Sequence, residues 1–338
     1  MATLESIWVV ILSYNGLEDT RKCLASMAGA VRPGVTTLLV DNGSTDGTAA
    51  AVSAEFPWCQ VLSVAENRGP AAGNNAGIRA ALESDCAWVL LLNNDTIVDP
   101  TLIDRLRDAI SAHRDYAIIG PVIKFMDDPD IVMTDGCVFN DPNYVGFFQR
   151  KPVPLTQGTP PHITDVDVVN GCCMLIRADV LRRIGPFDER MFIYHDETDL
   201  CLRATAAGGK LGVIDHALVW HKGSATFKTT GKRSARYYDA RNLLYVLRKH
   251  GGARGHGRSR IGSAAMYARY MYYWYCTESE GGHDQSANAV IEGIWDGLVG
   301  RHGRYEDRRR PLVGPIRLAF EILRRRPRWG SAVSHASK

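Results

Sequence analysis

The sequence lacks the features that mark membrane-spanning and exported proteins. Its 338 residues contain no uninterrupted apolar stretch of roughly 18 residues, the length at which a membrane helix is first considered. The apolar run 7–12 follows no Lys or Arg and is too short for the core of a signal peptide. We therefore expect a soluble or peripheral protein in the cytoplasm, one that touches at most the inner face of the membrane.

Two motifs that mark zinc, redox or dinucleotide-binding sites are also missing. The 8 cysteines form no C-x-x-C pair, which argues against a zinc or thioredoxin-like site. Adjacent Cys172 and Cys173 point to opposite sides if they lie on a strand, which fits buried thiols in a reducing compartment. The G-x-G-x-x-G fingerprint of dinucleotide-binding proteins is absent as well.

The charge is unevenly distributed. Residues 301–338 carry a net charge of +8, whereas the whole chain carries only +3. A basic C-terminus on a neutral-to-acidic body is compatible with an anionic partner such as a lipid surface, and equally with a solvated terminus. We expect no nucleic-acid partner.

The first 113 residues alternate between apolar, β-branched runs and helical patterns. Such alternation predicts parallel strands joined by helical crossovers, a Rossmann-like α/β sheet. The expected strands are 7–14, 35–40, 61–64 and 88–92, and the expected helices are 17–28, 48–56, 71–82 and 100–113.

Polar clusters follow these strands at Asn15, 41–46, 67–75 and 93–95. In a parallel sheet, ligands bind outside the carboxyl ends of the strands. The sequence therefore predicts that the four clusters converge on one binding site.

Beyond residue 113 the sequence predicts the helices and strands with less certain bounds. Residues 121–164 are rich in Pro, Gly and Asp and suggest short strands and a mobile loop. Strands are expected within 166–177 and 211–220, and helices at the end of 192–207, over 234–250 and over 261–276. We divide the chain into a catalytic domain, 1–250, and a helical, basic extension, 251–338.

Residues 315–328 combine an apolar face with five arginines, as an interfacial helix does. A helix packed on the catalytic domain or on the partner of a homodimer would show the same pattern.

Two stretches suit a nucleotide. Asp41 follows a buried strand and is suited to accept hydrogen bonds from a base or ribose, although an aspartate that caps the turn would look the same. In 67–77, Arg68 is suited to meet phosphate charge, and small residues such as Gly73 permit either phosphate approach or helix–sheet packing.

Asp95 closes an oxygen-rich corner with Asn93 and Asn94. One carboxylate plus a substrate diphosphate is the environment that Mg²⁺ or Mn²⁺ favours, but an aspartate that caps the next helix is the alternative. His221, at another strand end, is suited to bind metal or phosphate, or to be an ordinary surface group.

Three carboxylates lie within four residues at 196–199. Asp196 and Glu197 point about 100° apart at a helix start, so one of them can face an acceptor hydroxyl. Asp199 and Arg203 are suited to pair along the helix. An acidic helix N-terminus that complements the helix dipole is the alternative for the whole cluster.

The order of these stretches resembles family 2 glycosyltransferases of the GT-A type, especially their bacterial rhamnosyltransferase-like branch. The resemblance covers about residues 7–250. The matching stretches are VVILSYNG at 9–16, LLVDNGSTDGT at 38–48, ENRGPAAGNNAG at 66–77, LLLNNDT at 90–96, NGCCMLIR at 170–177, GPFDERMFIYHDETDLCLR at 185–203, WHKGSAT at 220–226 and RYYDARN at 236–242.

The resemblance implies an inverting, metal-dependent transfer of a sugar from a UDP- or dTDP-sugar to a hydroxyl of a saccharide or lipid-linked acceptor, in polysaccharide or glycolipid assembly. It implies that Glu197, or else Asp196, is the base and that Asp95 and His221 contact the metal or diphosphate. The positions implied or suited to bind the donor are Tyr14, Asn15, Asp41, Asn67, Arg68, Gly73, Asn74, Asn93, Asn94 and Arg241.

One departure from the family pattern stands out. Asn93 occupies the place of the first acid of the D-x-D metal motif, so the site has one negative charge fewer. This favours, as a rival, a non-catalytic nucleotide-sugar-binding protein on the same fold. A sugar-phosphate nucleotidyltransferase would need a Gly-rich, basic loop after the first strand, where this chain has Ser13-Tyr14-Asn15-Gly16.

Overall fold

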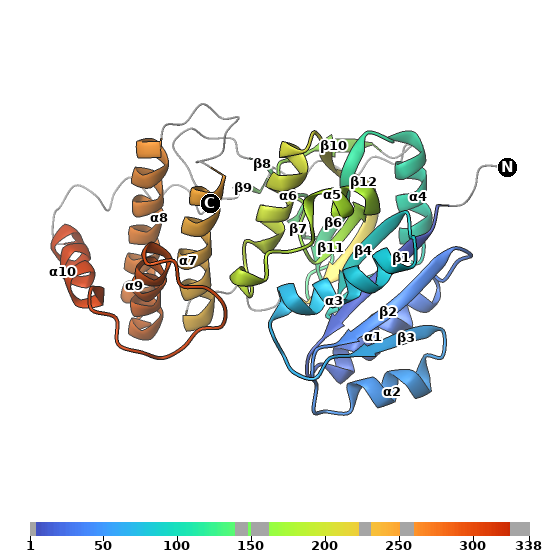
Figure 1. Cartoon of the computed structure of the whole chain (residues 1–338), viewed down its shortest axis with the longest axis horizontal. Coiled ribbons are helices and arrows are strands. Elements are labelled where there is room, and N and C mark those ends of the chain that lie inside the picture. Colours follow the sequence, from blue (N-terminus) through green and yellow to red (C-terminus); the bar gives the residue numbers. More distant parts are fainter. Residues whose placement is uncertain (1–4, 139–147, 150–161, 223–230, 251–259, 325–338) are drawn as a thin grey trace. The chain divides into compact units, whose positions relative to one another are not determined.

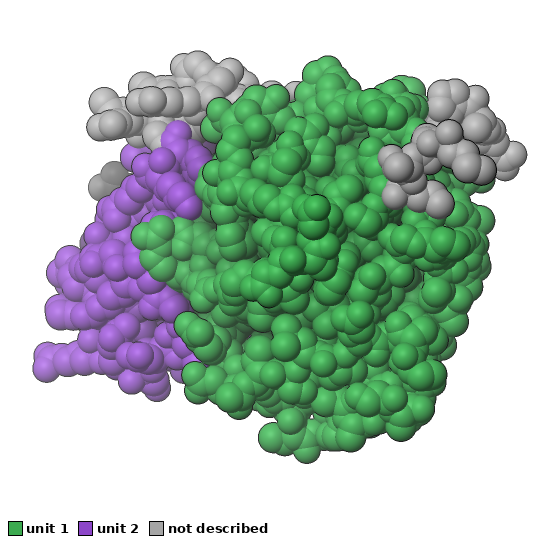
Figure 2. Space-filling model, turned by 45° about the vertical axis from the view of Figure 1, so that its right-hand side comes forward, with its two compact units in different colours: residues 1–138, 147–192, 196–224 green, residues 139–146, 193–195, 225–338 purple. Residues whose placement is uncertain are grey.

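A computed structural model describes residues 5–138, 148–149, 162–222, 231–250 and 260–324. The chain forms two compact units, coloured in Figure 2: unit 1 comprises residues 1–138, 147–192 and 196–224, and unit 2 comprises 139–146, 193–195 and 225–338. The predicted domain division near residue 250 stays a prediction.

The first part of unit 1 alternates strands and helices (Figure 1). The predicted α/β alternation over the first 113 residues is confirmed, with element ends shifted by two residues at most. The elements are β1 (Ile7–Ser13), α1 (Leu17–Ala28), β2 (Val35–Asp41), α2 (Thr48–Glu55), β3 (Cys59–Ser63), α3 (Pro70–Glu83), β4 (Trp88–Asn93), β5 (Thr96–Val98) and α4 (Leu102–Ala112).

The second part of unit 1 completes the sheet. Its elements are β6 (Tyr116–Phe125), β7 (Val132–Thr134), β8 (Cys137–Val138), β9 (Phe148–Gln149), β10 (Ile163–Asp165), β11 (Cys173–Arg177), α5 (Ala178–Ile184), the 3₁₀ turn η1 (Glu189–Met191), α6 (Asp196–Ala206) and β12 (Lys210–His221). The mobile loop predicted within 121–164 falls largely on 139–147 and 150–161, outside the described residues.

The main sheet has the order β10-β12-β6-β11-β4-β1-β2-β3. Strands β3, β2, β1 and β4 run parallel, as predicted, and β12 runs parallel to β6. Strand β11 enters antiparallel between β4 and β6. Because β1 is covered on both faces, its residues 7–12 are all apolar. Val9 and Ile11 join the core with α1 and α4, whereas Val10 faces Gly77 of α3.

Strand β6 begins before the stretch 121–164, for which only short strands were predicted. Pro121 is buried in the middle of the sheet, where the missing N–H would normally cost a ladder hydrogen bond. The register of the neighbouring strand β12 shifts between Ile214 and Leu218, opposite Pro121 and Val122. A bulge at this point accommodates the proline in a central strand.

Unit 2 is helical and consists mainly of α7 (Arg233–Lys249), α8 (Arg260–Glu280), α9 (Asp284–Leu298) and α10 (Val313–Arg324). Helix α9 was not predicted. Its Gly293 lets the backbones approach closely, since an added Cβ would lie 2.4 Å from the carbonyl oxygen of Tyr237 on α7. Within the described part of the chain, no helix is both long and apolar enough to cross a bilayer.

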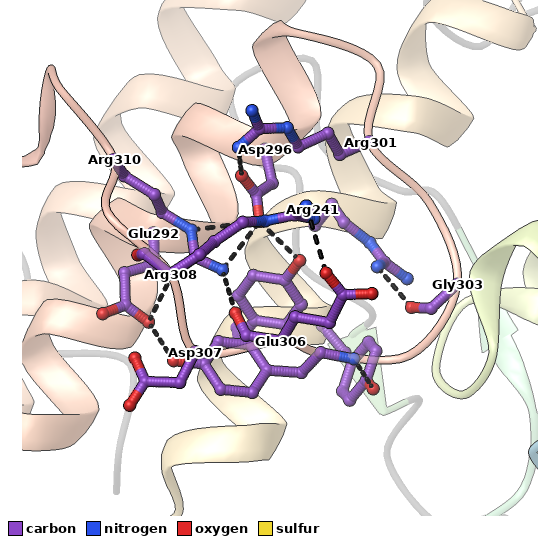
Figure 3. A network of polar contacts seen from close by, with 12 residues as sticks. Arg241, Glu292, Asp296, Arg301, Gly303, Glu306, Asp307, Arg308 and Arg310 are labelled. Carbon is purple, nitrogen blue, oxygen red and sulfur yellow. Dashed lines mark hydrogen bonds and ion pairs between the residues drawn. The ribbon is translucent and has the colours of Figure 1, made fainter.

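A buried ionic network ties α7 and α9 of unit 2 to the segment before α10 (Figure 3). Asp296 is fully buried and accepts hydrogen bonds from Arg310 Nε (3.0 Å) and from the hydroxyl of Tyr237 (2.8 Å). Burial alone would raise the pKa of Asp296, but the hydrogen bonds from Arg310 and Tyr237 outweigh it and lower the pKa. The carboxylate is therefore charged and matched by cations.

Replacing Asp296 with Ala should destabilise unit 2. We expect the free energy of unfolding, measured by urea denaturation, to fall by about 3–5 kcal/mol, because the buried guanidinium of Arg310 loses its partner. Glu306→Ala is the matched control: it removes an exposed ion pair with Arg308 (3.1 Å) and should cost about 1 kcal/mol or less. Equal losses in the two variants would contradict the assignment.

Candidate active site

The loops that follow β1, β2 and β4 are hydrogen-bonded to one another at one edge of the sheet. The backbone N–H of Asn42 donates to the carbonyl of Ser13 (2.8 Å), and Asn94 Nδ2 donates to Ser13 Oγ (3.3 Å). The three strands are parallel, so their carboxyl ends meet here. The predicted convergence of the polar strand ends is thus present.

Asn15 and Asp41 shape the first two loops. Asn15 has a left-handed backbone (φ 48°), which asparagine tolerates better than most residues, and its Oδ1 accepts from the N–H of Thr45 (2.8 Å). Buried Asp41 accepts from the N–H of Ser44 (3.1 Å), so it does form the turn that was the alternative to base binding. Tyr14, which precedes Asn15 in the chain, has half of its surface exposed.

The loop before α3 is held by Asn67. Its Oδ1 accepts from the N–H of Gly69 (2.8 Å) and from Nδ2 of Asn42 (3.2 Å). Arg68 extends into solvent, with 67% of its side chain exposed and Glu189 3.7 Å away. Gly73 packs on the sheet, since an added Cβ would lie 2.4 Å from Leu12.

Asn74 is half-buried in α3, and its neighbour Asn75 is a residue that the sequence reasoning missed. Buried Asn75 accepts from the N–H of Phe187 and donates to the carbonyl of the same residue, both at 2.9 Å. This two-sided bond joins α3 to the segment that leads to η1. The Asn-Asn pair was visible in the sequence, but only the fold reveals which amide is buried.

Asn94, which follows the departure at Asn93, holds the end of β4 to the loop after β1. Asn94 Nδ2 donates to Thr20 Oγ1 (2.9 Å) and lies near the carbonyl of Gly16 (3.4 Å). An ionised aspartate has no N–H to donate, so an amide is required for these bonds. Asn93, at the end of β4, is half-buried, and its carbonyl accepts from Thr96 Oγ1 (2.7 Å).

Asp95 and His221 form a pair. His221 ends β12 opposite Thr96 of β5, and its Nε2 lies 3.0 Å from Asp95 Oδ1. The backbone N–H of Lys222 donates to the carbonyl of Asp95 (3.0 Å) and fixes the two segments together. The structure therefore brings together the two residues that were predicted to bind a metal.

This pair fits a divalent cation only in part. Among the described residues, no group of three or more His, Cys, Asp or Glu side chains is arranged to hold a metal. Mg²⁺ and Mn²⁺ are commonly bound by one or two protein ligands together with substrate phosphates, and a carboxylate beside an imidazole 3.0 Å away supplies such a pair.

The acidic pair opens helix α6. Asp196 is buried and Glu197 is half-buried. Burial raises the pKa of Glu197, and a hydrogen bond with Asp196 opposes the rise. An added Cβ on Gly171 would lie 3.4 Å from Glu197 Cβ, and the carbonyl of the next residue, Cys172, accepts from the N–H of Asn93 (2.9 Å). Glu197 therefore lies near the end of β4.

The third acid of the cluster has a structural role, as predicted. Asp199 is fully buried and bonds Arg203 Nε (2.8 Å). The guanidinium of Arg203 continues to the carbonyls of Ile184, Gly185 and Pro186 at 2.7–2.8 Å. The pair therefore anchors the segment after α5.

Comparison with known proteins identifies the family. The family described as "Glycosyltransferase like family 2" matches residues 5–240, well over half of the chain. The chain belongs to this family. The predicted resemblance to family 2 glycosyltransferases is confirmed.

The relatives include rhamnosyltransferases. This glycosyltransferase is 28% identical, over 269 residues, to an N-acetylglucosaminyl-diphospho-decaprenol L-rhamnosyltransferase of Mycobacterium tuberculosis, covering 72% of this chain and 85% of the relative. It is 25% identical, over 252 residues, to the dTDP-rhamnosyl transferase RfbF of Shigella flexneri, covering 72% and 81%.

The fold resembles that of solved glycosyltransferases. The mannosyltransferase PcManGT from Pyrobaculum calidifontis, solved in complex with GDP-Man and Mn²⁺, superposes with a TM-score of 0.55 at 15% identity over 89% of each chain. The predicted GT-A fold, a mostly parallel sheet flanked by helices with a helical C-terminal region, is confirmed.

His195, which directly precedes the acidic pair in the chain, and Arg241 both belong to unit 2. His195, which the sequence reasoning passed over, is buried, and its Nε2 lies 2.8 Å from Asp239 Oδ1 on α7. Arg241, also on α7, is fully buried and donates to Asn242 Oδ1 (2.9 Å) and to the carbonyl of Gly303 (2.6 Å). Its predicted contact with the diphosphate stays a prediction.

Proposed function

We propose that this enzyme transfers a deoxyhexose or hexose from a nucleoside diphosphate sugar, UDP- or dTDP-linked, to a hydroxyl of a saccharide or lipid-linked acceptor. The observation that carries the proposal is the half-buried carboxylate of Glu197, whose pKa is raised by burial. It lies near the end of β4, which leads to Asp95, and Asp95 is paired with His221. Two of the relatives, a dTDP-rhamnosyl transferase and a diphospho-decaprenol rhamnosyltransferase, support the substrate classes.

The donor is assigned to the loops at the strand ends. Tyr14 offers an exposed ring for the base, and Asp41 a carboxylate for the base or ribose. Exposed Arg68 supplies positive charge for the diphosphate, beside the loop that Asn67 shapes. Further contacts proposed for the donor come from Asn15, Gly73, Asn74, Asn93, Asn94 and Arg241.

Asp95 and His221 would hold Mg²⁺ or Mn²⁺ together with the donor diphosphate. When bound, the cation acts as a Lewis acid for the charge of the leaving phosphate. The crystallised mannosyltransferase with the same fold contains Mn²⁺, which supports this assignment. The loss of one acid at Asn93 leaves the histidine as the second ligand of the pair.

Glu197 is the proposed base, with Asp196 as its alternative. The acceptor hydroxyl attacks the anomeric carbon on the face opposite the diphosphate, so a new carbon–oxygen bond forms as the bond to the phosphate oxygen breaks. The hydroxyl proton passes to the carboxylate, and the nucleoside diphosphate leaves with the bonding pair. A single displacement of this kind inverts the anomeric centre.

Glu197→Gln should lower kcat for transfer by about 10²–10⁴-fold, the usual contribution of a general base, while donor affinity measured by calorimetry is retained. In the wild-type enzyme, the transfer rate should fall as the pH drops through a value above the ordinary 4.5 of a glutamate, because burial raises this pKa and only the ionised carboxylate accepts the proton.

Assays of nucleoside diphosphate release, with a dTDP- or UDP-sugar, metal and acceptor, check both statements. Near-normal transfer by Glu197→Gln would move the base to another residue. Failure of the wild-type protein to release nucleoside diphosphate, despite binding the donor, would favour the non-catalytic alternative.

Asp95→Ala should weaken donor binding in the presence of Mn²⁺ by at least about tenfold, since losses of groups that merely support a metal ligand already cost about 10–100-fold. Calorimetric titration of the donor with Mn²⁺, and again with a chelator, measures the effect. The difference between wild type and variant should shrink with the chelator. Equal donor affinity with Mn²⁺ would remove Asp95 from the site.

A membrane surface is the proposed partner of helix α10, which suits a lipid-linked acceptor at the inner membrane face. Ile316 and Phe320 pack on the other helices of unit 2, whereas Leu318 and Ile322 are 62% and 49% exposed. Arg317 is exposed on the same helix. Exposed apolar side chains beside arginines favour the interface of an anionic bilayer. A homodimer contact through the same face is the alternative.

Co-sedimentation with vesicles tests this contact. Leu318→Gln combined with Ile322→Gln should lower the fraction bound to anionic vesicles by about tenfold, because two apolar side chains that the bilayer would bury are lost. The matched control replaces Leu298 and Val299, which are exposed at the end of α9, with Gln and should bind normally. Equal binding by both double variants would contradict the proposal; a loss of dimers without vesicle binding would favour the homodimer.

A further inference from the structure

The backbone just before the acidic pair is held in an unfavourable conformation. Phe192, Tyr194 and His195 have positive φ angles of 67°, 67° and 63°. Residues other than glycine rarely adopt such angles, and they do so only when surrounding contacts enforce the conformation. Helix α6 starts at the next residue, so the conformation of this segment sets the position and direction in which Asp196 and Glu197 enter the helix.

Helix α7 supplies contacts that hold the last three residues of this segment, 193–195. Asn242 is buried, and its Nδ2 donates to the carbonyls of Ile193 (2.8 Å) and Tyr194 (2.9 Å). One turn earlier, Asp239 Oδ1 lies 2.8 Å from Nε2 of the buried His195. Residues 193–195 belong to unit 2 with α7, although the chain on either side of them belongs to unit 1.

The orientation of the Asn242 amide is itself fixed. Arg241 Nε donates to Asn242 Oδ1 (2.9 Å), so the two N–H groups of the amide are turned toward the carbonyls of 193 and 194. Arg241 in turn donates to the carbonyl of Gly303 (2.6 Å), a contact drawn in Figure 3. Its guanidinium carbon lies 4.9 Å from the ring centroid of Tyr238.

We propose that Asn242 and Asp239 are positioning residues for the catalytic pair, which hold residues 193–195 in the strained backbone from which Asp196 and Glu197 project. The proposal rests on the proposed function, since it requires Glu197 to act as the base. The chemistry of the contact is specific: two adjacent carbonyls need two N–H donors on one short side chain, which asparagine has and aspartate lacks.

Asn242→Ala releases both carbonyls. We expect kcat to fall by about tenfold to a hundredfold, the cost of misplacing a catalytic group by about 1 Å. The KM for the donor should change by less than about threefold in Asn242→Asp, which keeps the oxygen that accepts from Arg241, a proposed donor contact. Asn242→Asp should behave like the alanine variant, since it keeps the size but offers no donor.

The pH profile separates positioning from a general loss of stability. If Glu197 moves out of its half-buried place, the burial that raises its pKa is relieved, so the acid limb of the transfer rate should shift to lower pH. Among the described residues, the titratable groups that interact with Glu197 include Asp196, Cys201 and Cys137. Burial raises the pKa of both thiols, that of Cys137 to about 12, so neither titrates near this limb.

Leu247→Ala is the matched control. Leu247 lies on α7 and packs on the core of unit 2, so its loss lowers the thermal midpoint without removing a bond to 193–195. We expect its acid limb and kcat to stay at wild-type values. If the Asn242 variants change only the thermal midpoint, as this control does, the proposal is wrong.

The proposed function is checked separately in the same series. If Glu197→Gln abolishes transfer while Asn242→Ala leaves kcat and the acid limb unchanged, the positioning role alone fails. If Glu197→Gln retains transfer, the assignment of the base fails, and the positioning role fails with it.

Discussion

Parallel pairing of β1 with β2 on one side and β4 on the other is the constraint on which the site depends. It brings three carboxyl strand ends to one edge, in register from Ile7 to Ser13 along the central strand. The loops that leave this edge then bond one another, through Asn42 to Ser13 and Asn94 to Ser13. The pairing of the strands therefore makes neighbours of polar residues that are far apart in the chain.

The half of the sheet with regular parallel strands could be predicted from the sequence. Uninterrupted apolar runs bounded by Gly, Asn and Asp reveal β1, β2 and β4, because strands buried on both faces need no polar alternation. Strand β6 could not be predicted, because Pro121 argues against a central strand and the bulge that compensates for it lies in β12, about 95 residues later. No local pattern reports a compensation so distant.

The candidate site divides in the same way. The family resemblance implied a shared metal or diphosphate role for Asp95 and His221, and helical spacing predicted the pair of Asp199 with Arg203. Which of two adjacent amides turns inward could not be predicted, as Asn75 shows, since it depends on packing against Phe187. The left-handed backbone at Tyr194 and His195 was equally hidden, because no glycine marks it.

The assignment of residues 193–195 to the helical unit has a practical consequence for protein engineering. Chimeras between related glycosyltransferases are usually joined where one compact unit gives way to the next, here near residue 225. A junction placed there would pair the α7 of one parent with the 193–195 tripeptide of the other. Asn242 would then face the carbonyls of 193 and 194 from a different parent sequence. Exchange of the C-terminal helices should therefore carry this tripeptide along as a second, very short insert.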